Sequence, residues 1–343
     1  MTPLVRFGPG SLRELADVCA EIGVERPLLV TTRRGRVVGD GLPVVGIYDG
    51  VRPHVPVETV GEAAHIATEL AADGLVALGG GSAIDTAKAV AARLLADTRH
   101  VTDRHKVIAV PTTYAGAEWT PFFGLLLAPG RKGGDRDDRV MPVAAIYDPE
   151  LTLELPLPVT VGTTMNALAH CAEAYYAPGS GERAAECADA GAAAIAEALP
   201  LVVDEPGSLS ARTRLLEGAM QAAFALSHSG LCLAHAMAQG LGGRFGLPQG
   251  SMNAICLPAA LRFNAEAVPD AVARFAAALG SDDAPATCAA LAALGGFSRL
   301  RDEGVPEEGL AETAAAIAER PGAKANPRPV TAADVERLLL EVW

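Results

Sequence analysis

Hydrophobic residues in the first 150 positions alternate between short continuous runs and longer amphipathic segments. Apolar runs of the length and composition of buried strands lie at residues 27–32, 43–51, 74–81, 106–113 and 143–149. Helical spacing of the apolar positions occurs at residues 11–23, 57–74 and 85–96. Short buried strands that alternate with helices predict a parallel sheet covered by helices on both faces, an α/β nucleotide-binding layout.

The pattern changes near residue 155. Beyond it the chain consists of long alanine-rich helical segments with glycine and proline breaks and almost no strand candidates. A chain of 343 residues also exceeds what one compact core usually contains. We therefore predict an α/β domain over residues 1–155 and an all-helical domain over residues 156–343. The glycine-rich, charged stretch 130–142 predicts a hairpin or a mobile loop on the sheet domain.

The overall charge restricts the possible partners. A net charge of -13 argues against nonspecific binding of nucleic acid or of anionic membranes, since both depend on Lys and Arg. The first residues do not resemble a signal peptide, and no run of about 18 apolar residues follows. Six cysteines occur without a CxxC pair, which favours reduced, buried thiols. We expect a cytoplasmic protein that acts on a small molecule.

A glycine cluster follows the third predicted strand. Gly79, Gly80 and Gly81 precede Ser82, which we expect to be the N-cap of the next helix. Glycine allows backbone N–H groups to approach a diphosphate, and a helix N-terminus favours its negative charge. The spacing is neither GxGxxG nor a P-loop, so a phosphate site and a simple tight turn both remain open.

Hydroxyl groups cluster after the fourth predicted strand. Thr112, Thr113 and Tyr114 lie where an open α/β sheet usually places its ligand-binding loops. These hydroxyls suit a ribose, a phosphate or a substrate oxyanion. The alternative is a polar turn that caps a helix.

Two helical segments carry polar side chains at the same spacing. Asn166 and His170 are four residues apart, as are His235 and Gln239, so each pair shares one helix face. Gln249 follows a Gly-Gly break and a proline. Two such helices facing each other could form a four-ligand site, although a lone buried histidine is more often a hydrogen-bonded core residue.

These four segments, in this order, resemble the iron-containing (group III) alcohol dehydrogenase family over essentially the whole chain. The resemblance implies a Rossmann-like N-terminal domain, a helical C-terminal domain and an active site in the cleft between them, an architecture shared with dehydroquinate synthase. Within the family, residues 111–124, 130–156 and 163–176 look most like maleylacetate reductases. Those enzymes use NADH or NADPH to reduce the carbon–carbon double bond of maleylacetate, which gives 3-oxoadipate. Members commonly form dimers, so we expect a homodimer.

The resemblance also assigns cofactor residues. It places the diphosphate at Gly79, Gly80, Gly81 and Ser82, and the nicotinamide ribose near Thr112, Thr113 and Tyr114. Lys132 matches a lysine that supports the same site. Arg33 and Arg34 fall where the adenosine ribose would lie, without the acidic residue that favours NAD, which suggests that NADPH is accepted. Two arginines in a solvated loop are the alternative.

The metal positions of the family are where this sequence departs. The family's Asp ligand corresponds to Asn166, and its three His ligands correspond to His170, His235 and Gln249. A further pocket histidine corresponds to Gln239. Because carboxamides are weak neutral donors and divalent iron or zinc normally takes three or more His, Cys or carboxylate ligands, we predict that no metal is bound.

Without a metal, the substrate carbonyl must be polarised by hydrogen-bond donors. The donors available are a protonated His170 or His235, the Tyr114 hydroxyl, and the side-chain amides of Asn166, Gln239 and Gln249. Arg244 could bind a substrate carboxylate, although a surface arginine is the alternative. We thus predict an NAD(P)H-dependent, metal-independent reductase of an activated alkene or ketone acid, similar to maleylacetate reductase.

Three other functions remain open. A redox-neutral reaction like that of dehydroquinate synthase would use the same architecture, but that chemistry normally depends on a metal. The pocket could be rebuilt for another pathway substrate, with Gln239 and Gln249 recognising an amide or a hydroxylated ring. The chain could also be a non-catalytic binding or scaffold protein, which would not need the glycine and threonine motifs.

Overall fold

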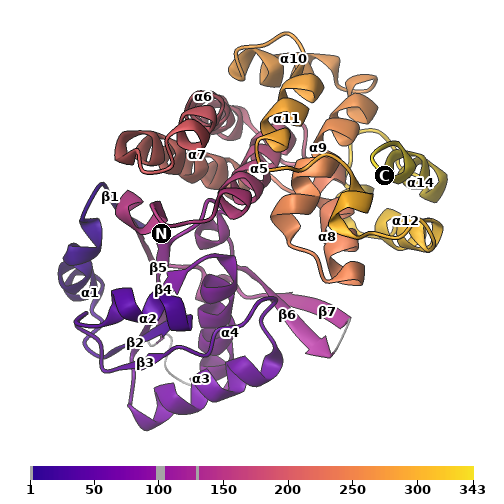
Figure 1. Cartoon of the computed structure of the whole chain (residues 1–343). Coiled ribbons are helices and arrows are strands. Elements are labelled where there is room, and N and C mark those ends of the chain that lie inside the picture. The colour runs from indigo at the N-terminus through magenta and orange to yellow at the C-terminus, as the bar shows by residue number, and fades with distance from the viewer. Residues whose placement is uncertain (1–2, 98–104, 129–130) are drawn as a thin grey trace. The chain divides into compact units, whose positions relative to one another are not determined.

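The computed structural model describes residues 3–97, 105–128 and 131–343 (Figure 1). The chain folds into two compact units. The sheet unit comprises Met1–Thr113 and Ala117–Thr152, and the helical unit comprises Tyr114–Gly116 and Leu153–Trp343. Tyr114–Gly116, which follow the fourth predicted strand, therefore belong to the helical unit. A single boundary at residue 155 assigns them to the sheet domain instead.

The sheet unit is built on a six-stranded parallel sheet in the order β1-β8-β5-β4-β2-β3. Its strands are β1 (Leu4–Phe7), β2 (Pro27–Thr31), β3 (Gly46–Tyr48), β4 (Gly74–Gly79), β5 (Lys106–Pro111) and β8 (Ala144–Tyr147). The predicted parallel sheet and its five strands are confirmed. The sequence pattern missed β1, because this four-residue edge strand is only partly buried and lacks a continuous apolar run.

Helices cover both faces of this sheet. They are α1 (Leu15–Ile22), α2 (Arg33–Gly39), α3 (Val57–Glu69) and α4 (Gly81–Asp97). Alternate residues of one strand enter different cores, as strand geometry requires. Leu28 packs in the core that includes residues of α3 and α4, whereas Leu29 packs in the core that includes residues of α1. Two-sided burial explains why the central strands are continuous hydrophobic runs.

An antiparallel hairpin, β6 (Phe122–Ala128) and β7 (Arg131–Arg136), forms a second sheet in this unit (Figure 1). Of the stretch 130–142, predicted as a hairpin or a mobile loop, Arg131–Arg136 forms the second strand of this hairpin, and the first strand lies before that stretch. Buried Lys88 on α4 fixes its first strand, because its Nζ donates to the Phe122 carbonyl oxygen at 2.6 Å. Asp85, which pairs with Lys88 at 3.1 Å, accepts from the Gly124 N–H at 3.0 Å. Asp85 and Lys88, which follow the glycine cluster on α4, thus anchor the hairpin.

The helical unit packs small residues between long helices. Among the described residues it contains α5 (Leu157–Ala174), α6 (Glu182–Asp204), α7 (Leu209–Ser227), α8 (Leu233–Phe245), α9 (Gln249–Ala265), α10 (Pro269–Ala278), α11 (Ala284–Ala293), α12 (Leu310–Ala318), α13 (Pro321–Lys324) and α14 (Ala332–Glu341). A Cβ atom on Gly191 of α6 would lie 2.9 Å from the Cys171 sulfur of α5. The alanine-rich pattern therefore reflects close helix approach, and α5 is buried along most of its length.

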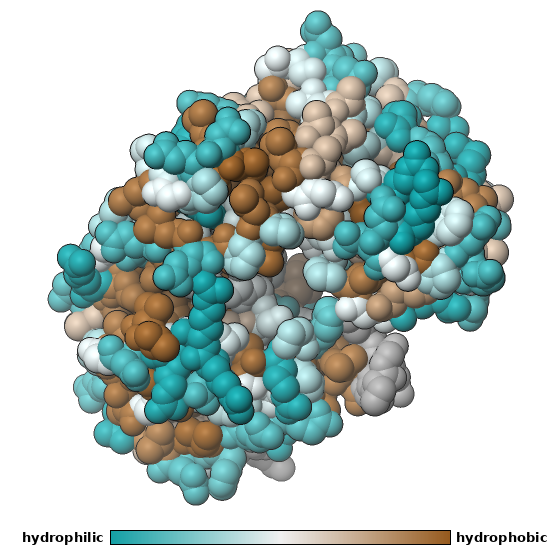
Figure 2. Space-filling model, viewed as in Figure 1, coloured by the Kyte–Doolittle hydropathy of each residue, from teal (hydrophilic) through white to brown (hydrophobic). Residues whose placement is uncertain are grey.

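The surface is mixed in polarity. Figure 2 shows hydrophilic and hydrophobic residues interspersed on the face in view. In the part of the chain that the structure describes, no helix combines the length and the apolar character needed to cross a membrane.

Candidate active site

The glycine turn lies at the carboxyl end of β4. Gly79 has φ +152, and a Cβ atom there would lie 2.8 Å from the Cβ of Ala83, so the turn requires glycine. Helix α4 begins at Gly81. The predicted N-cap role of Ser82 is therefore wrong, because Ser82 lies inside the first helical turn. Its position beside the turn is nevertheless where a phosphate would meet the helix N-terminus.

The threonine pair lies next to this turn in the same unit. The Thr112 N–H donates to the Gly79 carbonyl oxygen at 3.0 Å. A Cβ atom on Gly80 would lie 2.9 Å from Thr113 Cγ2. The adjacent parallel strands β4 and β5 bring these residues together at their carboxyl ends. Two predicted cofactor motifs thus share one edge of the sheet, as ligand loops of α/β sheets do.

The third predicted cofactor segment flanks the turn from the β2 side. The Thr31 hydroxyl donates to the Leu78 carbonyl oxygen at 2.7 Å, and the Thr32 side chain caps α2 by accepting from the Gly35 N–H at 3.2 Å. Arg33 and Arg34 are exposed in the first turn of α2. The alternative to a cofactor role placed these two arginines in a solvated loop. They are exposed to solvent, but they lie in a helix rather than a loop, because Thr32 caps α2.

Lys132 lies on β7 opposite Leu126. Its side chain is outside the part of the chain that the structure describes.

In the helical unit, the Asn166 side chain is the centre of a hydrogen-bond network. Its Nδ2 donates to the Ala115 carbonyl oxygen at 2.9 Å and lies 3.4 Å from His170 Nε2. Its Oδ1 accepts from Asn253 Nδ2 at 2.7 Å and from Gln249 Nε2 at 3.3 Å. Both protons and both lone pairs of this amide are thus used.

The Ala115 carbonyl sets the direction of the whole network. A carbonyl oxygen can only accept, so the Asn166 atom that faces it must be the nitrogen. Asn166 Oδ1 then faces the amide nitrogens of Gln249 and Asn253. A hydrogen bond from Asn166 to His170 Nε2 requires a lone pair on Nε2, which places the His170 proton on Nδ1.

Tyr114–Gly116 brings this carbonyl close to His170. Gly116 has φ +83, and a Cβ atom there would lie 3.1 Å from the Ala223 Cβ and 3.4 Å from His170 Cε1. Only glycine suits this backbone and this approach. The PTTYAG motif therefore has two structural roles: its threonines follow β5, and Ala115 and Gly116 lie beside Asn166 and His170.

The two predicted histidines lie against each other. The rings of His170 and His235 are stacked, with centroids 4.6 Å apart and planes 4° apart. Burial, together with the charge of a protonated His235, holds the pKa of His170 well below its usual range. His170 Nδ1 and His235 Nε2 are buried without a hydrogen-bond partner in the structure. These atoms are the polar groups of the two rings that a substrate could engage.

Glu173, which the sequence reasoning missed, orients His235. Its Oε2 lies 2.7 Å from His235 Nδ1, and the carboxylate also accepts from the backbone N–H groups of Cys232 and His235. Both side chains are fully buried. The carboxylate places a proton on His235 Nδ1 and leaves Nε2 for other chemistry. The signal was available, because Glu173 lies three residues after His170 on the buried face of α5.

Three predicted site residues lie elsewhere. The Tyr114 hydroxyl accepts from buried Arg212 at 3.3 Å. Gln239 Oε1 accepts from Arg320 Nη2 at 3.3 Å. Arg244 lies on the surface, paired with Glu312 at 2.6 Å. This position agrees with the alternative that Arg244 is a surface arginine, because Glu312 already pairs with its guanidinium.

The side chains present do not fit the family's metal. Among the described residues, no group of three or more His, Cys, Asp or Glu side chains could hold a metal ion. Asn166 Oδ1 already accepts two hydrogen bonds, and Gln249 turns its amide nitrogen toward that oxygen. His170 and His235 alone are fewer than the ligands that iron or zinc takes.

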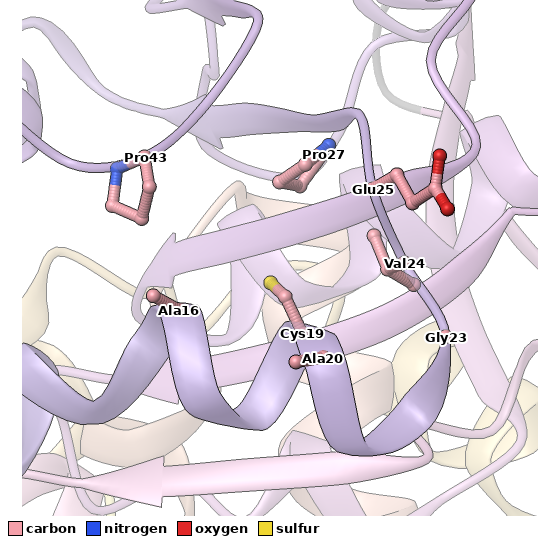
Figure 3. A pocket seen from close by; sticks show the side chains of 8 residues that line it. All are labelled: Ala16, Cys19, Ala20, Gly23, Val24, Glu25, Pro27 and Pro43. Carbon is pink, nitrogen blue, oxygen red and sulfur yellow. The ribbon is translucent and has the colours of Figure 1, made fainter.

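The cysteines lie outside this cluster. Five are buried, as predicted, but Cys187 is partly exposed. Figure 3 shows the Cys19 thiol among the residues that line a pocket of the sheet unit, which include Pro27, Pro43 and Glu25. Burial, followed by the charge of Asp73, raises the pKa of Cys19 to about 11, so this thiol stays protonated at neutral pH.

Comparison with known proteins covers both units. Residues 2–149 match the model of the iron-containing alcohol dehydrogenase family, and residues 160–343 match the model of its C-terminal region. Maleylacetate reductase from Pseudomonas knackmussii is 41% identical over 90% of this chain and 87% of the relative. The crystal structure of maleylacetate reductase from Agrobacterium tumefaciens has 32% identity and a TM-score of 0.90, with 100% of this chain and 96% of that chain covered.

A further structural neighbour carries a cofactor. Sulfoacetaldehyde reductase from Bifidobacterium kashiwanohense, solved in complex with NAD+, is 27% identical, with a TM-score of 0.90 over 99% of this chain and 96% of that chain. Family models thus match nearly the whole chain, and close relatives in sequence and structure are reductases. The protein belongs to the iron-containing alcohol dehydrogenase family and is an oxidoreductase.

Proposed function

We propose that this protein reduces the carbon–carbon double bond of maleylacetate with NADH or NADPH, gives 3-oxoadipate, and does so without a bound metal. The identity to curated maleylacetate reductases, 41% for the Pseudomonas knackmussii enzyme, supports the substrate. The structural observation that carries the proposal is the saturated hydrogen bonding of Asn166. Asn166 stands where the family has its Asp ligand, and its amide is used to orient neighbouring groups.

The cofactor would bind along the carboxyl edge of the sheet. The N–H groups of the turn at Gly79–Gly81 and the N-terminus of α4 suit its diphosphate, and Thr112 and Thr113 suit a ribose. Arg33 and Arg34 suit the 2′-phosphate of NADPH, because no acidic side chain occupies that segment of α2. The NAD+ complex of the Bifidobacterium kashiwanohense neighbour supports a nicotinamide cofactor in this fold.

The reaction needs no Lewis acid if the enolate is stabilised by hydrogen bonds. Hydride adds to the alkene carbon that is β to the ketone, and the π electrons move to form an enolate. A proton then adds to the α carbon, so one hydride and one proton saturate the double bond. A bound NADH or NADPH would supply that hydride, so its oxidation would balance the reduction of the alkene.

The histidine pair supplies polar atoms for both steps. His170 presents Nδ1–H as a hydrogen-bond donor, because its Nε2 faces the Asn166 amide. His235 Nε2 is the ring nitrogen open to a proton transfer, because Nδ1 is engaged by Glu173 at 2.7 Å. Glu173 is in this account a positioning residue.

An assay of the purified protein tests this function. We expect oxidation of NADH or NADPH that depends on maleylacetate and yields 3-oxoadipate in equal amount. Cofactor binding without oxidation would favour a non-catalytic homologue. Turnover of a substrate without net cofactor oxidation would favour a redox-neutral reaction like that of dehydroquinate synthase.

A further inference from the structure

Arg320 is a desolvated cation without a counter-ion. Its side chain is half-buried, and its Nη2 donates to Gln239 Oε1 at 3.3 Å. Its Nε is buried and has no hydrogen-bond partner. Within the described ranges, no carboxylate lies at ion-pair distance from it, whereas Arg244, Arg262 and Arg274 are all paired. Burial lowers the pKa of Arg320, in keeping with the absence of a carboxylate at ion-pair distance among the residues that the structure describes.

The position of Arg320 is fixed by close backbone packing. The residue lies between α12 and α13 and is the N-cap of α13. A Cβ atom on Gly240 of α8 would lie 2.3 Å from Ile317 Cγ1 of α12. A Cβ atom on Gly322 of α13 would lie 2.7 Å from the Cys232 carbonyl oxygen, just before α8. Two close contacts at glycine therefore hold the backbone on either side of Arg320 against α8 and the segment before it.

Gln239 lies on the same helix as His235 and makes a side-chain contact with Arg320. Gln239 follows His235 by four residues on α8, so both side chains project from one face of the helix. Its Oε1 orients the guanidinium but adds no charge that would neutralise it. A glutamate at this position would neutralise the arginine, and a histidine would compete with it as a second donor. The glutamine, in place of the family's histidine, thus leaves an oriented, uncompensated cation beside Gln239, which follows His235 by one helical turn on α8.

We propose that Arg320, oriented by Gln239, binds a carboxylate of the substrate. This inference rests on the proposed function, whose substrate has a carboxylate at each end. A guanidinium forms two parallel hydrogen bonds with a carboxylate, and a half-buried site strengthens them relative to water. Arg212 also has an unpartnered nitrogen, Nη2, but its Nε donates to the Pro206 carbonyl and its Nη1 to Tyr114 and Thr160, so no second free nitrogen remains for a bidentate carboxylate.

The first test is Arg320→Met, which keeps the apolar stem and removes the charge. We expect kcat/KM for maleylacetate to fall by roughly 30-fold to several hundredfold, mainly through KM, since one partner of a partly buried charge pair is lost. Calorimetric titration with 3-oxoadipate should show a similar loss of affinity. Affinity for the nicotinamide cofactor should stay unchanged, which also verifies that the variant is folded.

A second variant separates substrate binding from a structural role. Gln239→Glu places a carboxylate beside Arg320, so the protein should become more stable to thermal unfolding while its affinity for 3-oxoadipate falls at least about tenfold. If Arg320 served only the packing of α13, the added ion pair would stabilise the protein and leave 3-oxoadipate binding intact. That result would overturn the proposal.

The matched control is Arg262→Met, on a surface arginine of the same unit that pairs with Glu341. It should leave kcat/KM within about twofold. Arg244→Met, tested beside it, measures the role that the sequence suggested for Arg244. A larger loss in Arg244→Met than in Arg320→Met would contradict the assignment.

The two proposals can fail separately. If the wild-type protein reduces maleylacetate and Arg320→Met matches it in KM and in 3-oxoadipate affinity, the Arg320 site is wrong and the reductase function stands. If the wild-type protein does not reduce maleylacetate, the function is wrong. Titration with adipate then still decides whether Arg320 binds dicarboxylates, because binding lost in Arg320→Met supports the site and binding absent from the wild type refutes it.

Discussion

The two halves of the buried cluster differ in how their polar atoms are used. In the amide half, Asn166 exchanges hydrogen bonds with Gln249, Asn253 and the Ala115 carbonyl, and Asn253 Oδ1 is a buried atom without a partner. In the imidazole half, His170 Nδ1 and His235 Nε2 have none. Paired groups hold a geometry, whereas unpaired buried groups are available for a ligand. On this contrast we propose that the amide half orients the site and that the imidazole half reacts with the substrate.

The largest expected effect is on the imidazole half. His235→Asn should lower the rate of hydride transfer and protonation by roughly 10²- to 10⁴-fold, since it removes the group that Glu173 prepares for proton transfer. Single-turnover kinetics at saturating cofactor and substrate would measure it. A loss below about tenfold would mean that another group donates the proton, and the division between the halves would be wrong.

The amide half should show its largest effect on stability. Asn166→Asp replaces the donor that faces the Ala115 carbonyl by an oxygen, and buries a charge beside it. We expect the free energy of unfolding to fall by about 1–3 kcal/mol or more, measured by urea denaturation. Unchanged stability would contradict the hydrogen-bond directions assigned to this amide.

A double variant tests whether the frame still suits a metal. Asn166→Asp with Gln249→His would bring a carboxylate and a third imidazole to His170 and His235. Added Zn²⁺ should then raise the thermal midpoint of the double variant, because a ligand that binds only the folded state stabilises it. The wild-type protein should show no such shift, and a wild-type shift equal to that of the double variant would break the account.

The pH dependence of stability sharpens the role of His170. Its folded-state pKa lies well below the ordinary 6.5, first because of burial and then because of His235. Below pH 6.5 the unfolded state binds a proton at His170 that the folded state does not bind. The free energy of unfolding is therefore at its full value above pH 6.5 and declines as the pH falls below 6.5. The slope should be about 1.4 kcal/mol per pH unit for this group.

Variants can isolate that slope. The variant His170→Gln should reduce the slope of stability against pH. The variant His65→Gln should leave that slope unchanged, because the His65 side chain is 73% exposed. Thermal unfolding between pH 5 and 8, the range in which histidine titrates, would measure both. An unchanged slope in His170→Gln would show that this imidazole is charged in the folded protein.

The smallest expected effect belongs to Gln249. Its 3.3 Å contact with Asn166 is long, and Asn253 already donates to the same oxygen at 2.7 Å. Gln249→Ala should therefore cost only about 1 kcal/mol in stability and reduce kcat less than tenfold. A loss of kcat as large as that of His235→Asn would move Gln249 from the positioning half to the reacting half.

The fold and half of the cluster were predictable because their signals are local. Strand and helix periodicity predicted the parallel sheet, and the four-residue spacing identified Asn166 with His170 on α5. The contacts that complete the cluster are not local. The Ala115 oxygen belongs to the backbone and has no sequence signature, and Gln239 lies 81 positions from Arg320. The pairing of Arg244 with Glu312, 68 positions away, could likewise not be predicted from local sequence spacing.

The most direct test of metal-independent reduction is the maleylacetate-dependent oxidation of NADH or NADPH by protein that has been treated with a chelator and verified to be free of iron and zinc. The account predicts the same rate as for untreated protein, and no increase when Fe²⁺ or Zn²⁺ is added. Activity that disappears with the metal and returns with either ion would contradict it.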